Sequence, residues 1–222
     1  MTNKKKITVA TIYFIIFITI WTCYRIFVDE WLDIYITNQV LCEFIKHGVI
    51  KNIIYTLPAI VLIKHYKNDI SISLKEMFTT KVRWIKYLPI FIIFTIFILI
   101  YAYFACGEIA IADEFGLDKI VIVLFVGLTE ELVARGWLLN MVIEDDKKWK
   151  GIIISTIFFL LMHFPKWIQY QMLISIFTSY ACIVHIVLYF IFGWTFIKSR
   201  SIFVPIVIHM YWDLLLFIFV GG

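Results

Sequence analysis

The chain has 222 residues, of which 63% are hydrophobic, 18% aromatic and only 16% charged, with a mean hydropathy of +0.93. This apolar share lies far above that of a soluble globular domain, so a protein whose main solvent is water is excluded. The net charge of +4 does not indicate nucleic-acid binding, because the lysines and arginines lie mostly between apolar runs, where they orient a protein in the lipid bilayer. We therefore predict an all-α, polytopic membrane helix bundle, with residues 1–222 as a single membrane domain.

Seven apolar segments can each reach across ~30 Å of hydrocarbon at ~1.5 Å per residue, if tilt is allowed for and the weaker segments fall slightly short. In chain order we expect these spans at about residues 7–28, 48–63, 84–105, 119–142, 151–164, 172–197 and 202–220. The first follows three lysines, but it is long enough to span and no cleavage site follows it, so we interpret it as a retained helix. Basic clusters mark alternate ends of the spans, which predicts a multi-pass protein of the cell membrane with a cytoplasmic N-terminus and a C-terminus outside.

The fourth predicted span carries three charges near its centre, in the sequence TEELVARG at residues 129–136. Each ionisable side chain within a span costs roughly 2.5–3.5 kcal/mol on insertion scales, so each needs a partner or a function. Glu131 and Arg135 are four residues apart on one helical face, which predicts an ion pair in which Arg135 has a structural, orienting role. Glu130 points about 100° away from that face and has no cation near it in the sequence, so it is our first choice for a general base acting on water.

Two later spans contribute histidines. His163 ends the sequence FLLMH in the fifth span, and His209 begins HMYWD in the seventh, where the spacing of four puts His209 and Asp213 on one face. Histidine can exchange a proton near neutral pH, donate to a developing oxyanion or bind a metal ion. Asp213 can orient His209 by accepting from its ring N–H, or act beside it at the water. We expect the fourth, fifth and seventh spans to form a cavity whose catalytic side chains are Glu130, Glu131, His163, His209 and Asp213.

Each of these residues taken alone also has a structural interpretation. An intramembrane histidine often hydrogen-bonds to a neighbouring helix, and a Glu–Arg pair can link two turns or two helices. What favours a functional site is the grouping of two glutamates, an arginine, two histidines and an aspartate on three late spans.

The motifs EExxxRG at residues 130–136, FxxxH at 159–163 and HxxxD at 209–213 follow in order on successive late spans. Together they resemble the CAAX-protease and bacteriocin-processing family of intramembrane proteases, also called the Abi family. The resemblance covers about residues 119–222, the expected catalytic core, whereas residues 1–118 match only in being variable, hydrophobic spans. One departure is Asp213, where many members carry asparagine.

The resemblance implies hydrolysis of a peptide bond within or beside the membrane. In that interpretation Glu130 and His163 activate a water molecule, and His209 with Asp213 holds the oxyanion or a metal ion. The same side chains fit two mechanisms, one with zinc bound by His163, His209 and a carboxylate such as Glu130, and one without metal in which Glu130 is the base. The expected substrate is a membrane-associated peptide or protein. Abundant Ile, Lys and Phe indicate an AT-rich bacterial genome, which favours a bacteriocin- or peptide-signal-related substrate.

Two other functions remain open at this point. A non-catalytic membrane immunity or scaffold protein would use the same residues as polar contacts between helices and would bind a membrane partner. A proton- or ion-coupled transporter also places Glu, His and Arg within spans, but the sequence has neither paired repeats nor matching broken half-helices. Nothing in the sequence indicates an oligomeric state.

Overall fold

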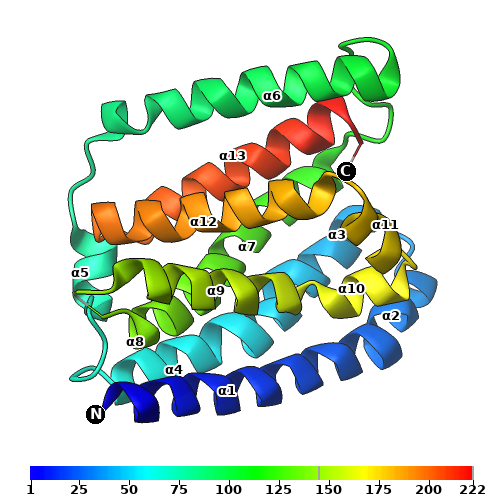
Figure 1. Ribbon diagram of the computed structural model, residues 1–222. Coiled ribbons are helices and arrows are strands. Elements are labelled where there is room, and N and C mark those ends of the chain that lie inside the picture. The colour runs from blue at the N-terminus through cyan, green and yellow to red at the C-terminus, as the bar shows by residue number, and fades with distance from the viewer. Residues whose placement is uncertain (145, 222) are drawn as a thin grey trace.

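A computed structural model of the chain describes residues 1–144 and 146–221, and every regular element in these two stretches is helical (Figure 1). The predicted all-α membrane bundle is therefore confirmed. The α-helices are α1 (Asn3–Tyr24), α2 (Glu30–Tyr35), α3 (Gln39–Glu43), α4 (Leu57–His65), α5 (Leu74–Thr79), α6 (Leu88–Cys106), α7 (Leu117–Glu131), α8 (Asn140–Val142), α9 (Lys148–Met162), α10 (Phe164–Gln169), α11 (Leu173–Thr178), α12 (Ala181–Ser199) and α13 (Phe203–Phe219).

Several of these helices are joined end to end by π-helical stretches, whose turns are wider than those of an α-helix. Such stretches lie at Arg25–Asp29, Phe44–Ile50, Asn52–Thr56 and Leu132–Leu139. They continue α1 into α2, α3 into α4 and α7 into α8, so that long helices run over Asn3–Tyr35 and Gln39–His65. π-Helical turns are rare and concentrate at functional sites. Here they contain or adjoin most of the buried charged side chains, namely Arg25, Asp29, Lys46, Lys51, Glu131 and Arg135.

Each of the seven predicted spans corresponds to a helical segment, although the bounds differ. In the described part of the chain, five helices are long and apolar enough to cross a membrane: Asn3–Tyr35, Gln39–His65, Leu88–Cys106, Lys148–Gln169 and Ala181–Ser199. Helix α13 is apolar but shorter, at 17 residues, and the fourth segment carries three charges near its centre. The sixth span begins later than predicted, because Ser179 adopts an extended conformation between α11 and α12 and its hydroxyl accepts from the Ala181 N–H.

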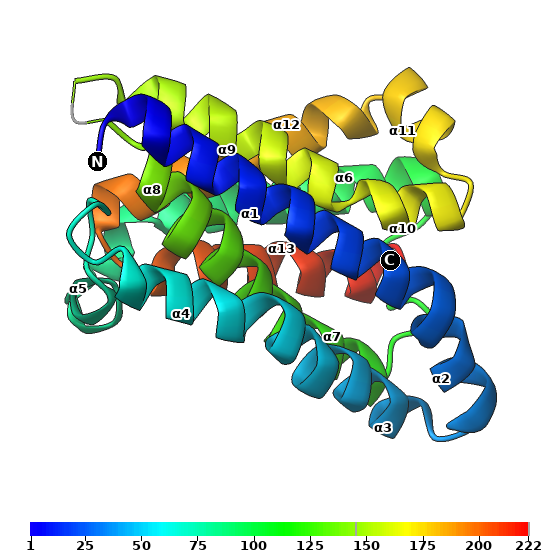
Figure 2. The same ribbon diagram turned by 90° about the horizontal axis from the view of Figure 1, so that it is seen from below.

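Helix α7 and its π-helical continuation lie inside the bundle, with α13, α9 and the helix that ends in α4 packed around them (Figures 1 and 2). Contact between α7 and α13 is especially close at Gly127. A Cβ there would lie 2.6 Å from Met210 Cγ and 3.2 Å from the Ile206 carbonyl oxygen. Small residues allow such backbone approach between membrane helices, where van der Waals packing drives association. Helix α6 lies at the edge of the bundle and packs on α13.

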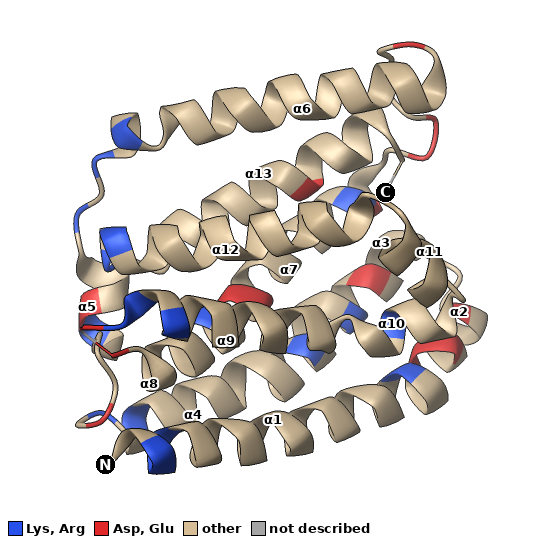
Figure 3. Cartoon of the chain, in the orientation of Figure 1, with Lys and Arg blue, Asp and Glu red and all other residues tan. Residues whose placement is uncertain are grey.

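The two ends of the bundle differ in charge. Lysines and arginines gather at the end where α1 begins and α12 ends, and the N- and C-termini lie at opposite ends (Figure 3). Opposite termini agree with an odd number of spans. Several long apolar helices make this a multi-pass membrane protein, while the assignment of the basic end to the cytoplasm stays a prediction.

Candidate active site

The three late spans bring the predicted site residues together. Glu130 and Glu131 end α7, His163 directly follows α9, and His209 lies in α13. The Nε2 atom of His163 is 3.7 Å from Glu130 Oε2, and the Nδ1 atom of His209 is 2.9 Å from Glu131 Oε1. Side chains that are up to 79 residues apart in the sequence thus form one polar cluster inside an otherwise apolar bundle.

The predicted pair of Glu131 and Arg135 is present and fully buried. The guanidinium donates from Nη1 to Glu131 Oε1 over 3.0 Å, and both side chains are 0% exposed. Its Nη2 atom donates to the Tyr189 carbonyl oxygen over 2.9 Å, and its central carbon lies 4.1 Å from the centroid of the Phe159 ring. Arg135 therefore ties α7, α9 and α12 together around Glu131, as expected for an orienting residue.

His209 lies between two carboxylates. Its Nδ1 faces Glu131 Oε1, and its Nε2 is 3.4 Å from Asp213 Oδ2, so the predicted contact of His209 with Asp213 is also present. A ring whose two nitrogens both face carboxylate oxygens is arranged to donate from both. The stacked Phe192 ring, with centroids 4.9 Å apart, fixes the plane of the imidazole.

The environment of His163 defines its tautomer. Its Nδ1 is 2.8 Å from the Phe159 carbonyl oxygen, an acceptor that requires the proton to be on Nδ1. Nε2 is then an acceptor that faces Glu130. The Tyr189 hydroxyl lies 3.4 Å from this Nε2, and its ring stacks on the imidazole. Tyr189 is not among the predicted site residues, and its only signal in the sequence is a polar hydroxyl within an apolar span.

A second missed residue is Lys51. Glu130 has no cation near it in the sequence, but the structure provides one from the N-terminal half: Lys51 Nζ donates to Glu130 Oε1 over 2.6 Å, and only 4% of the Lys51 side chain is exposed. The cationic partner of Glu130 thus comes from a distant span, which local spacing along the sequence does not reveal. Lys51 lies inside the second predicted span, so the cost of a charge within the membrane was the signal that could have identified it.

Two carboxylate oxygens of the cluster are buried without a hydrogen-bond partner from the protein. They are Glu130 Oε2 and Glu131 Oε2. A buried acceptor without a donor is costly, and in native proteins such atoms mark bound water or a reactive site. The Glu130 oxygen is the one that faces His163.

The side chains do not fit a zinc ion in this arrangement. Among the residues that the structure describes, no three His, Cys, Asp or Glu side chains are grouped so that they could hold a metal ion. Both nitrogens of His209 face carboxylates, and Lys51 engages one oxygen of Glu130. Of the predicted ligands, only His163 Nε2 and Glu130 Oε2 are then open, fewer than the three protein ligands of a catalytic zinc. We derive no step through a metal.

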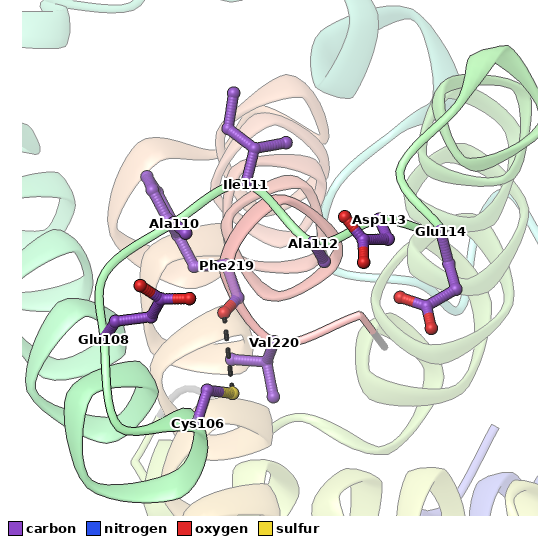
Figure 4. A pocket seen from close by; sticks show the side chains of 9 residues that line it. All are labelled: Cys106, Glu108, Ala110, Ile111, Ala112, Asp113, Glu114, Phe219 and Val220. Atoms are coloured by element: carbon purple, nitrogen blue, oxygen red, sulfur yellow. Dashed lines mark hydrogen bonds between the residues drawn. The ribbon is translucent and has the colours of Figure 1, made fainter.

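Two hollows at the surface of the described chain lie away from the predicted cavity. One of about 270 Å³ lies between the end of α6 and the end of α13, and is lined by Cys106, Glu108, Asp113 and Glu114 among others (Figure 4). The second is lined by residues from Asp33 to Glu43 with Asp118 and Lys119. Neither hollow includes a residue of the polar cluster.

Residues 114–215 match the family model described as Rce1-like, type II CAAX prenyl endopeptidase. This segment begins just before α7 and ends within α13, so it contains Glu130, His163 and His209, and Lys51 lies outside it. No curated protein and no solved structure matches the chain. The match agrees with the resemblance to the CAAX-protease and bacteriocin-processing family.

Proposed function

We propose that this protein, whose residues 114–215 form an Rce1-like domain, is an endopeptidase that hydrolyses a peptide bond of a membrane-associated peptide or protein, with Glu130 as general base. The domain supports an intramembrane protease of the CAAX type in general. The residue roles and the substrate class are our proposal.

The observation that carries the proposal is the pair of acceptors at the centre of the cluster. Glu130 Oε2 has no donor, and His163 Nε2 is left as an acceptor because Nδ1 holds the ring proton. These two atoms are 3.7 Å apart and face each other, which is unfavourable unless a donor lies beside them. A water molecule that donates one hydrogen to each atom resolves the conflict and keeps its lone pairs directed away, toward a substrate carbonyl.

The reaction then balances as an ordinary hydrolysis. The water oxygen bonds to the carbonyl carbon of the scissile peptide, and its proton passes to Glu130 Oε2. The C–N bond breaks, and the proton returns from Glu130 to the leaving nitrogen, which gives a carboxylic acid and an amine. In this proposal His163 orients the water. His209 donates to the negative charge on the carbonyl oxygen by releasing its longer contact, the 3.4 Å one from Nε2 to Asp213 Oδ2.

The test compares purified wild type with Glu130→Gln and His163→Asn in nanodiscs. The probes are internally quenched peptides of two kinds, one with a prenylated C-terminal cysteine motif and one with a bacteriocin-precursor sequence. We expect cleavage by wild type and loss of about 10²–10⁴-fold in kcat in each variant, because general acid–base groups contribute rate factors of that size. Glu108→Gln is the matched control, because Glu108 is an exposed carboxylate in the loop after α6. This variant should cleave the probes at the wild-type rate.

Each outcome separates the alternatives. Cleavage of only one probe type identifies the substrate class. Wild-type rates in a folded Glu130→Gln protein would overturn the assignment of the base. A non-catalytic immunity or scaffold role is supported instead if wild type cleaves neither probe and Glu130→Gln restores the cellular function of a deletion strain as well as wild type does. A chelator arm, with zinc added back, tests the metal question independently of our interpretation of the side-chain geometry.

A further inference from the structure

Lys51 is the buried lysine of the N-terminal half that contacts Glu130. We propose that Lys51 is a positioning residue for Glu130: its ammonium group holds one carboxylate oxygen so that the other faces His163 and the water between them. The inference rests on the proposed function and extends it to a residue outside the Rce1-like domain.

Lys51 is held in a defined place by its own surroundings. It is 3% exposed, and its Nζ lies 5.7 Å from the Trp21 ring centroid and 5.0 Å from that of Tyr55. These two rings pack edge to face, with centroids 5.0 Å apart, so α1 and the second span form a rigid aromatic wall against the ammonium group. The cation is thus directed at Glu130 with little freedom to move elsewhere.

The backbone of the second span is also shaped for this contact. Lys51 lies between the π-helical stretches Phe44–Ile50 and Asn52–Thr56, whose wide turns change which face of the helix is directed inward. One turn earlier, a Cβ at Gly48 would come within 3.0 Å of the Phe125 ring on α7. The two helices therefore approach closely just before the level of Lys51 and Glu130.

A second buried ion pair in the same chain shows how a carboxylate is held when its contacts only link helical turns. Asp29 is 3% exposed and uses both oxygens: Oδ2 pairs with Arg25 at 2.8 Å, and Oδ1 accepts from the Tyr24 hydroxyl and lies 3.5 Å from Lys46 Nζ. Glu130 is also buried, but only Oε1 is engaged, by Lys51. Its other oxygen is left without a donor and faces His163. Glu130 therefore differs from Asp29 and resembles Glu131 of the same polar cluster, whose Oε2 is also buried without a donor from the protein.

The experiment has a stability arm and a kinetic arm. In the stability arm, Lys51→Met, Glu130→Gln and the double variant are unfolded in detergent. Each single change leaves a buried group without its partner, so both should lower the unfolding midpoint, and the double variant should recover most of the loss. Strictly additive losses would overturn the contact, whether or not any probe peptide is cleaved.

In the kinetic arm, the prenylated and bacteriocin-precursor probes are used with Lys51→Met, Lys51→Arg and Lys46→Met. A misplaced base is expected to lower kcat by about 10²-fold with little change in KM. Lys51→Arg keeps the charge and should give a kcat between those of wild type and Lys51→Met. Lys46→Met is the matched control: it removes another buried lysine of the same span, paired with Asp33 at 2.6 Å, and should lower stability without lowering kcat.

The outcomes distinguish this inference from the proposed function. If wild type cleaves a probe and Lys51→Met keeps the wild-type kcat, Lys51 is only structural and the inference fails. If Lys46→Met loses as much kcat as Lys51→Met, general destabilisation explains both and the inference also fails. If wild type cleaves nothing while the stability arm shows coupling, the contact stands and the proposed function is the part that fails.

Discussion

Gly127→Ala tests whether the close contact of α7 with α13 assembles the site. The new Cβ would lie 2.6 Å from Met210 Cγ, in the middle of that side chain, and 3.2 Å from a backbone oxygen of α13. The helices must therefore move apart. Inserting a methyl group into a packed contact typically costs about 1–3 kcal/mol, and the better helix propensity of alanine offsets up to about 1 kcal/mol. Because the backbone oxygen of α13 cannot rotate away as a side chain can, we take the upper end of that cost and expect a net loss of about 2 kcal/mol in the free energy of unfolding.

The assay is unfolding by sodium dodecyl sulfate in mixed micelles, followed by circular dichroism, together with the cleavage rate of a probe peptide. The rate should fall as well, because separation of α7 from α13 moves Glu131 away from His209. Gly136→Ala is the matched control on the same long helix, since the nearest atom to its Cβ would be at 3.5 Å, which is ordinary contact. If Gly127→Ala unfolds at the same point as wild type and Gly136→Ala, the close approach does not limit the assembly of the site.

Two further predictions concern other charged contacts. Arg135→Met removes the guanidinium partner of the fully buried Glu131, so the free energy of unfolding should fall by about 3–5 kcal/mol. Adding Glu131→Gln should restore part of this loss; equal losses in the single and double variants would contradict the prediction. Outside the spans, the hydrogen bond from Arg200 lowers the pKa of Glu76. A lowered carboxyl pKa adds stability above its unfolded value that disappears as the pH falls through the folded one. The difference in melting temperature between wild type and Glu76→Gln should therefore be small at neutral pH, because the pair is exposed and worth about 0–1 kcal/mol. This difference should vanish on acidification. A difference that grows in acid would refute the prediction.

Local spacing predicts much of the site. The apolar runs indicated the helical spans, because only a helix satisfies its backbone polar groups in hydrocarbon over that length. Spacing of four residues predicted the contacts of Glu131 with Arg135 and of His209 with Asp213, and both are present. The motif order predicted a family that the match of residues 114–215 bears out. The break between α11 and α12 was missed, because an apolar run alone does not reveal where a serine hydroxyl caps the chain.

The sequence by itself therefore determined that the protein lies in a lipid bilayer and where its helices span it. It also determined which charged side chains need partners there, and which ion pairs form within one helix. Only the tertiary structure decided which charges meet across helices. Lys51 and Glu130 are 79 residues apart, and His163 and Tyr189 meet from different helices. Such contacts depend on helix rotation and crossing, which are set by close approach at residues such as Gly48 and Gly127 and by the π-helical turns that redirect a face. The sequence shows that Glu130 needs a partner, but the packing of the helices selects it.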